Sequence, residues 1–454
     1  MMKTKSKNTL TERQFIFYGL NYVVGFGFIA TISKVINQGI WGVFVFILTS
    51  LITLAVIFAF ARAGQKYQNE VGGSYAYAKK TFKNGLVFFS GWNQVARIML
   101  FSATSPLFFS TLLTQFDPDR QWVYVSISLV VYIILILAGS FGFKLSKQII
   151  LVTAIFKWAT LLIGFGLIIY LIIQSNTYGH TFSQIEPFSV TLFASTILSF
   201  IYSYGGFESL ATISQSVETK RFKKVIILMF LIVISSYFLF YIIFIGLGKE
   251  YLSNFGLEQV YKTLWGTTGV SLFTIGLFFN RMSATMGSVQ PYARYIAPLA
   301  EDGFLPSIFA KKNKHNEYHH AIYLSVSLAI TSSIIFTIIP RIAGVTDTFG
   351  TILKAGNISF LIQYFLTLFT VLIWKWRKSE QIPIWEIVIY IIGMVVILFT
   401  LIVSQLPFIS SSSEEVTFEQ FIPLISYVAA ILIGYIVKFL NSWLKKRKLR
   451  KVVS

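Results

Sequence analysis

The sequence predicts an all-α polytopic membrane protein with about 12 transmembrane helices. The 454-residue chain is 55% hydrophobic and only 12% charged, whereas soluble domains are about 45–50% apolar and about 25% charged. Its mean hydropathy is +0.70. Long apolar segments recur along it, and a helix of about 20 apolar residues spans a hydrocarbon core about 30 Å thick. Helices bond every backbone amide internally inside lipid, and the alternating ten-residue pattern of a β-barrel is not seen.

Twelve apolar segments follow one another along the chain. The first is too long for a signal peptide and no small-residue cleavage site follows it, so we expect a retained helix. Their boundaries are predicted at residues 15–36, 41–62, 85–114, 122–142, 149–174, 190–215, 223–248, 268–298, 320–340, 349–374, 383–407 and 420–440.

Basic residues are distributed unequally between the two sets of loops. One set, with the C-terminal tail, holds 28 Lys and Arg, and the other holds five: Lys34, Arg120, Lys249, Lys262 and Arg341. The positive-inside rule therefore predicts cytoplasmic N- and C-termini in a plasma (inner) membrane, with the basic tail against anionic lipids. The net charge of +20 is explained by this pattern, and no basic stripe indicates nucleic acid.

Two segments contain glycines at positions where a helix can unwind. The first holds the residues Gly25 to Phe28, and the sixth holds Ser203 to Glu208. Glycine tolerates most backbone angles, and paired interrupted segments in two halves of a transporter indicate its substrate site. Small residues for helix packing are the alternative explanation. The predicted substrate-binding residues are Gly25, Phe26, Gly27, Phe28, Ser203, Tyr204, Gly205, Gly206, Phe207 and Arg281.

The spacing of these breaks predicts an inverted repeat, because they lie five segments apart and five is odd. Discontinuous helices 1 and 6 would then open two five-helix repeats. We expect a cytoplasmic N-terminus at 1–14, the first repeat at 15–174, the second at 190–376, two further helices at 383–440 and a basic tail at 441–454.

Four stretches carry a resemblance to a known family. They are "VGFGFI" from Val24, "VGGSYAYAKKTF" from Val71, "SYGGFE" from Ser203 and "ARYIAPLAEDGFLPSIFAKKNK" from Ala293. In this order and spacing the chain resembles permeases of the amino acid–polyamine–organocation (APC) superfamily. The resemblance implies a ten-helix inverted-repeat core with two extra helices, an amino acid substrate held at the breaks of helices 1 and 6, and alternating access without ATP. No phosphate-binding glycine loop is present.

The sequence departs from the family pattern at three positions. Phe26 stands between the first-helix glycines, where a small residue is usual, and would narrow the pocket. After helix 6 the family has a Glu and then a Pro, whereas this chain has Ser216 and Lys220. These departures concern the subfamily and the inner gate rather than the fold.

Five ionisable residues lie well inside apolar segments: Arg97, Lys157, Glu208, Arg281 and Lys354. Each costs about 2.5–3.5 kcal/mol at mid-bilayer on insertion scales, so each should face the protein core or a wet cavity. Lys157 aligns with the helix-five lysine of the family, which takes the place of sodium in proton-coupled relatives. We predict that it couples transport to protons; a permanently charged bridge between helices is the alternative.

The other charges have competing interpretations. Glu208 is either a proton relay or a structural partner for a cation and for amides freed by unwinding, and Arg97 is expected to bond between helices. Arg281 either binds a substrate carboxylate or bonds between helices. Beside the sixth-segment break, Tyr204 and Phe207 are the predicted aromatic gate.

The predicted function is therefore secondary active transport of amino acids, by proton symport or alternatively by exchange or uniport. An ion channel would show filter loops or charged rings, and a membrane-embedded enzyme would show clustered catalytic residues. Neither pattern is seen, so we expect no enzyme activity, no metal and no cofactor beyond a coupling proton or other ion. Acidic external loops favour cationic substrates and the intramembrane arginines favour anionic ones, which leaves the side-chain class and the oligomeric state open.

Overall fold

The structure is a computed structural model that describes residues 10–141, 143–176, 178, 182, 187–252, 256–314, 316–345, 347–406 and 417–453. The predicted N-terminus is thus described from residue 10 only. Helices dominate these residues: α1 (Glu12–Val23), α2 (Phe26–Ile36), α3 (Ile40–Lys66), α4 (Ser74–Lys79), α5 (Asn84–Ser102), α6 (Thr104–Leu113), α7 (Gln121–Gly139), α8 (Phe143–Ser175), α10 (Val190–Phe200), α11 (Phe207–Thr212), α12 (Phe222–Ile245), α13 (Leu257–Glu301), α14 (His319–Ile342), α15 (Thr348–Trp376), α16 (Ile384–Gln405) and α17 (Ile422–Val453).

Shorter elements connect these helices. The 3-10 turns are η1 (Pro118–Arg120), η2 (Ile201–Tyr204), η3 (Ser214–Ser216), η4 (Lys249–Tyr251), η5 (Ser307–Ala310) and η7 (Phe418–Phe421). Two-residue strands β1 (Leu10–Thr11) and β2 (Val217–Glu218) pair in parallel, with Leu10 opposite Val217.

The helices confirm the predicted all-α polytopic membrane fold. Among the described residues, nine helices are long and apolar enough to cross a membrane, and α1 with α2 forms a tenth span bent by 48°. The two remaining predicted spans correspond to α13 and to the interrupted run α10–η2–α11. Helix α13 contains many polar residues. The apolar run Val190–Tyr204 is shorter than a full span because the break follows it.

Some helix ends differ from the predicted segment boundaries. Helix α13 begins at Leu257 and is kinked at Gly266, before the predicted span 268–298. Helix α17 continues to Val453 through the basic tail. That tail is rich in Lys and Leu, which are good helix formers, so the helix persists after its apolar pattern has ended.

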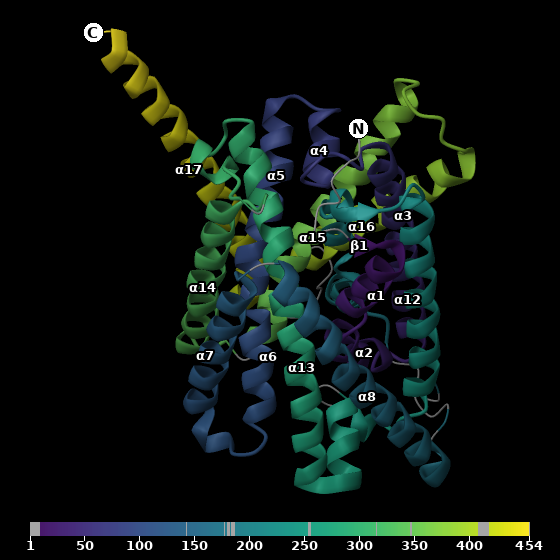
Figure 1. Cartoon of the computed structure of the whole chain (residues 1–454). Coiled ribbons are helices and arrows are strands. Elements are labelled where there is room, and N and C mark those ends of the chain that lie inside the picture. The colour runs from purple at the N-terminus through teal and green to yellow at the C-terminus, as the bar shows by residue number, and fades with distance from the viewer. Residues whose placement is uncertain are drawn as a thin grey trace.

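The interrupted helices lie inside the bundle. Helix α13 packs along α8 and against α5, α7 and α14, while α3 packs against α10, α12 and α16. Helices α1 and α2 lie between α8 and α12, and α2 contacts η2. Figure 1 shows α4 and the end of α17 at one end of the bundle and the start of α13 at the other. The division into two five-helix repeats stays a prediction.

Candidate functional site

The first helix is interrupted between α1 and α2. Helix α1 begins with a capping box in which Thr11 and Gln14 satisfy each other's backbone amides, and it ends at Val24, whose backbone is extended. Lys157 of α8 reaches this break: its ammonium donates to the carbonyl of Asn21 at 2.6 Å and to the carbonyl of Val24. The Lys157 side chain is 2% exposed. A buried cation therefore occupies the carbonyl end of α1.

The sixth predicted segment is interrupted after η2. Gly205 is extended and Gly206 has φ +126°, a conformation that favours glycine. The amide of Gly206 donates to both carboxylate oxygens of Glu208, at 3.2 and 3.0 Å. Glu208 is 2% exposed, so a buried anion occupies the amide end of α11.

The two breaks touch each other. The hydroxyl of Thr31 donates to the carbonyl of Gly27 at 2.7 Å and lies 2.9 Å from the hydroxyl of Ser203. A Cβ added at Gly27 would meet the carbonyl oxygen of Tyr202 at 2.9 Å. Glycine at position 27 is thus required for the backbones to approach this closely.

Arg97 of α5 joins the second break to the surrounding helices. Its guanidinium forms an ion pair with Glu208 at 3.4 Å and donates to Gln363 and to the hydroxyl of Tyr295, both at 2.6 Å. Tyr364 donates to Glu208 at 3.2 Å. The buried pair thus links α5, α11, α13 and α15, an arrangement that combines the structural roles predicted for both charges.

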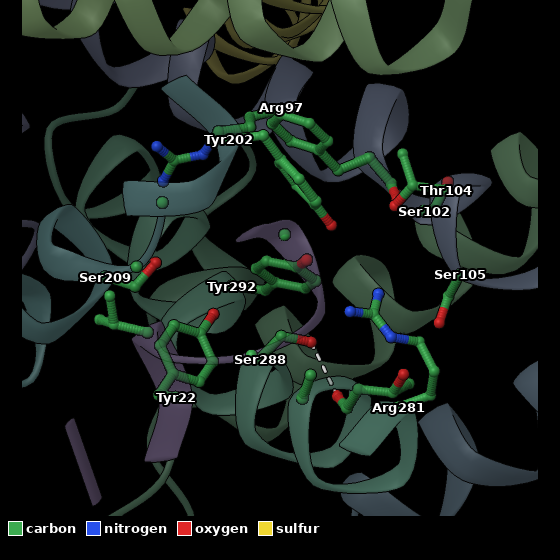
Figure 2. A pocket seen from close by; sticks show the side chains of 18 of the residues that line it. Tyr22, Arg97, Ser102, Thr104, Ser105, Tyr202, Ser209, Arg281, Ser288 and Tyr292 are labelled. Carbon is green, nitrogen blue, oxygen red and sulfur yellow. Dashed lines mark hydrogen bonds between the residues drawn. The ribbon is translucent and has the colours of Figure 1, made fainter. Parts of the chain in front are cut away.

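A cavity of about 140 Å³ lies where the two breaks meet. Its walls come from both breaks and from α5, α6, α7, α13 and α15, and most lining side chains are hydroxyl-bearing or charged. Figure 2 shows hydroxyls of Tyr22, Ser288 and Tyr292 around it, with the Arg281 guanidinium on one side. We call this the central cavity.

The structure brings most predicted site residues to the central cavity. Its lining includes Gly25, Gly27, Gly205, Gly206, Arg97, Glu208 and Arg281. The side chain of Phe26 lies outside the described residues. Lys157 does not line the cavity but binds the break beside it.

Four predicted residues face elsewhere. Phe28 stacks on Tyr237 with ring centroids 4.5 Å apart, and Ser203 bonds to Thr31. The hydroxyl of Tyr204 lies 2.7 Å from the hydroxyl of Ser50. Phe207 packs on Phe230. The prediction that Tyr204 and Phe207 form an aromatic gate is not supported by this packing. The aromatic side chains that do line the cavity are Tyr22, Phe101, Tyr132, Tyr202, Tyr292 and Phe360.

Helix α13 supplies site residues that the sequence analysis missed. Asn280 lies beside the first break, since a Cβ at Gly25 would meet its amide nitrogen at 3.2 Å. The polar stripe of Arg281, Thr285, Ser288 and Tyr292 lines the cavity. Its spacing of four, three and four residues follows one helical face, and that pattern in an otherwise apolar segment was the available signal.

A larger cavity of about 990 Å³, here called the vestibule, is lined by residues that follow those of the central cavity along α2 and α6. Ala30 lines the vestibule one turn after Gly27, and Leu107 lines it two residues after Ser105. A salt bridge of 3.2 Å between Lys34 and Asp347 crosses its wall. Three of the five basic residues of the weakly basic loops, Lys34, Lys262 and Arg341, line the vestibule.

Contacts away from the vestibule join the two broken helices to their neighbours. Tyr18 of α1 donates to the carbonyl of Gly287 at 3.2 Å. Arg294 of α13, which the sequence analysis overlooked, donates to the hydroxyl of Ser216 at 2.8 Å. Ser216 stands where the resembling family usually has a Glu, so the Arg294 guanidinium donates to a neutral hydroxyl here rather than to a carboxylate. The β1–β2 pair adds a direct link between the N-terminus and the segment after α11.

Comparisons with known proteins agree with this architecture. Residues 10–438 match the amino acid permease family. An uncharacterized protein of Mycoplasma genitalium is 28% identical, over 96% of both chains. An uncharacterized transporter of Mycobacterium bovis is 22% identical, over 69% of this chain and 71% of its own. A vacuolar cationic amino acid transporter of Arabidopsis thaliana is 24% identical, over 44% of this chain and 30% of its own.

Proposed function

Since the chain belongs to the amino acid permease family, we propose that it carries amino acids across the plasma membrane as a secondary active transporter, by alternating access and proton symport. The observation that carries this proposal is the meeting of both helix breaks at the central cavity, with the Lys157 ammonium bound to the first break. A multi-pass membrane protein of this family has no evident use for such a site other than to hold its cargo.

The ends of the half-helices suggest how an amino acid binds. Helix α2 begins beside the cavity, which Gly25 and Gly27 line, and helix N-termini favour negative charge. The carbonyl end of η2 lies across the cavity at Tyr202 and Gly205. We infer that the substrate carboxylate binds at α2 and its ammonium at η2, the arrangement expected of discontinuous membrane helices.

Lys157 is the proposed coupling group. Its ammonium ties α8 to the carbonyls of Asn21 and Val24, so a change in its proton content changes how firmly the first break is held. Arg281 lines the central cavity and follows Asn280, which lies beside Gly25 of the first break. Substrate binding at the central cavity would therefore be felt at the lysine through this second cation.

The vestibule suggests the direction of access in this state. It is lined by basic residues of the loops predicted to be external, while Tyr18, Arg294 and the β1–β2 pair join segments away from it. We propose that this state faces the external side, and that inward opening separates those contacts.

The test is uptake of radiolabelled amino acids into proteoliposomes, with and without an inward proton gradient. Wild type should show saturable, gradient-driven uptake and counterflow. Lys157→Ala should lose gradient-driven uptake. Lys157→Arg, whose guanidinium keeps its proton at all working pH values, should retain counterflow while losing the response to the gradient. Lys354→Arg, at the other lysine of an apolar segment, is the matched control and should retain both.

Other outcomes would decide against parts of the proposal. Uptake that ignores the gradient in wild type would identify an exchanger or uniporter and leave Lys157 a structural bridge. Absence of uptake and counterflow for every amino acid, from monodisperse protein, would remove the amino acid assignment.

A further inference from the structure

The lining of the central cavity holds more basic than acidic residues. Its ionisable lining residues, apart from tyrosines, are Arg97, Glu208 and Arg281. Arg97 and Glu208 form the 3.4 Å ion pair that links four helices, so their formal charges cancel. The lining as a whole therefore carries one formal positive charge, at a side chain that is only 9% exposed.

The position of Arg281 suits a ligand rather than the bulk solvent. Figure 2 shows its guanidinium beside Ser105, on the opposite side of the cavity from Arg97. Hydroxyls of Ser102, Thr104 and Ser288 surround the same space. A guanidinium binds a carboxylate through two parallel hydrogen bonds, whereas the hydroxyls of Ser102, Thr104 and Ser288 already donate to backbone carbonyls.

The vestibule repeats the same imbalance independently. Its charged lining residues are Lys34, Lys262, Arg341 and Asp347, which sum to two formal positive charges. Clefts lined by one sign of charge concentrate ligands of the opposite sign and raise their association rate. The acidic external loops noted in the sequence do not determine this path, because three of its four charged lining residues are basic.

From these two cavities we infer that the substrate is an amino acid with an acidic side chain, such as glutamate or aspartate. This inference rests on the proposed function. One carboxylate binds the amides at the start of α2, the ammonium binds the carbonyls of η2, and the second carboxylate binds Arg281. A substrate of net charge −1 offsets the +1 of the cavity, which a zwitterionic or cationic amino acid does not.

The first experiment compares wild-type uptake of glutamate, aspartate, glutamine, asparagine, leucine, lysine and arginine in proteoliposomes. Glutamate or aspartate should have the highest kcat/KM, by at least about 10-fold over the matching amide. A wild-type preference for amides, leucine or basic amino acids would overturn the inference while leaving amino acid transport intact. Failure to transport all seven would instead refute the proposed function.

Substitution of Arg281 tests which carboxylate it binds. Arg281→Gln should lower kcat/KM for glutamate by about 100-fold and shift the preference toward glutamine, because a charge-assisted contact is removed and an amide can be matched. Arg281→Lys should retain part of the acidic preference. An equal loss for acidic and neutral substrates would place the α-carboxylate at Arg281 and overturn the inference.

Two further variants distinguish the effect of a charge that lines the vestibule from the effect of a charge elsewhere on the protein. Arg341→Gln should raise KM for glutamate about two- to five-fold at low ionic strength, with kcat unchanged, and the difference should fade at high salt. Arg447→Gln is the matched control, since Arg447 contacts Trp443 on α17 and lines neither cavity. An identical KM effect in both variants would show that vestibule charge does not guide the substrate.

Discussion

Glu258 provides a titratable group whose effect on folding can be calculated from the structure. It lies in the first turn of α13, before the Gly266 kink and outside the predicted span 268–298. Its side chain is buried and accepts a hydrogen bond from Gln115 at 2.6 Å. Burial raises the pKa of Glu258 to about 7, against the opposing effects of the Gln115 hydrogen bond and the Lys262 charge.

The sign of the stability effect follows from proton binding. Between about pH 4.5 and 7 the folded protein holds a proton on Glu258 that the unfolded chain releases, so the free energy of unfolding falls as pH rises through this window. A rise in pKa from 4.5 to about 7 corresponds to about 3 kcal/mol, since one pKa unit is about 1.4 kcal/mol. Above about pH 7 this loss of stability is complete, and the free energy of unfolding no longer changes with the titration of Glu258.

Glu258→Gln should remove this dependence because an amide does not titrate and can still bond to Gln115. The assay is reversible unfolding in mild detergent at intervals from pH 4.5 to 8, comparing wild type, Glu258→Gln and the control Glu419→Gln, whose carboxylate is exposed. The wild type and the Glu419→Gln variant should lose about 3 kcal/mol more than the Glu258→Gln variant across the window. Parallel curves for Glu258→Gln and wild type would refute the reasoning.

Two further predictions concern the breaks themselves. Arg97→Met and Glu208→Gln should each lower the free energy of unfolding by about 3–5 kcal/mol, because each leaves a buried charge without its partner. In the double variant the loss should be smaller than the sum of the two single losses, by about 2 kcal/mol. Strictly additive losses, measured by unfolding in detergent, would contradict the pairing. Gly206→Ala should lower the free energy of unfolding by at least about 1–2 kcal/mol. The φ of Gly206 is +126°, and the added Cβ would meet the Tyr22 side chain at 2.9 Å. Gly166→Ala, which meets nothing within 4 Å, is the control, and equal melting shifts in the two alanine variants would disprove the strain.

The sequence was a good guide to where the helices break and a poor guide to which side chains face the cavity. Glycines marked both breaks, and at Gly206 the φ of +126° is a conformation that favours glycine. The direction of a side chain beside a break depends on the local helical geometry. Residues Ile201–Tyr204 form a 3-10 turn, which has about 3.0 residues per turn rather than 3.6. Residues two apart lie on different sides of such a turn, and here Tyr202 lines the cavity while Tyr204 turns toward Ser50.

Long-range contacts lay outside what the sequence could predict. Each strand of the β1–β2 pair has only two residues, which is too short for any alternation to be recognised. The partners of Arg97 are 266 and 198 residues away in sequence, so its bonding between helices could be expected but not assigned. A charged residue inside an apolar segment could be recognised as important from the sequence, but the residues that it bonds to could not.

The signs of the buried charges at the two breaks explain which helix ends remain for a substrate. The carbonyl end of α1 holds the Lys157 ammonium, and the amide end of α11 holds the Glu208 carboxylate, each the charge that the helix dipole favours there. Each break has a second end, and these two have the opposite polarity: the amides at the start of α2 and the carbonyls at the end of η2. Both line the central cavity. In the proposed binding mode, a ligand that satisfies them carries an anion and a cation a few bonds apart, which is the common part of every α-amino acid. Arg281 is proposed to bind the side chain, which differs among them.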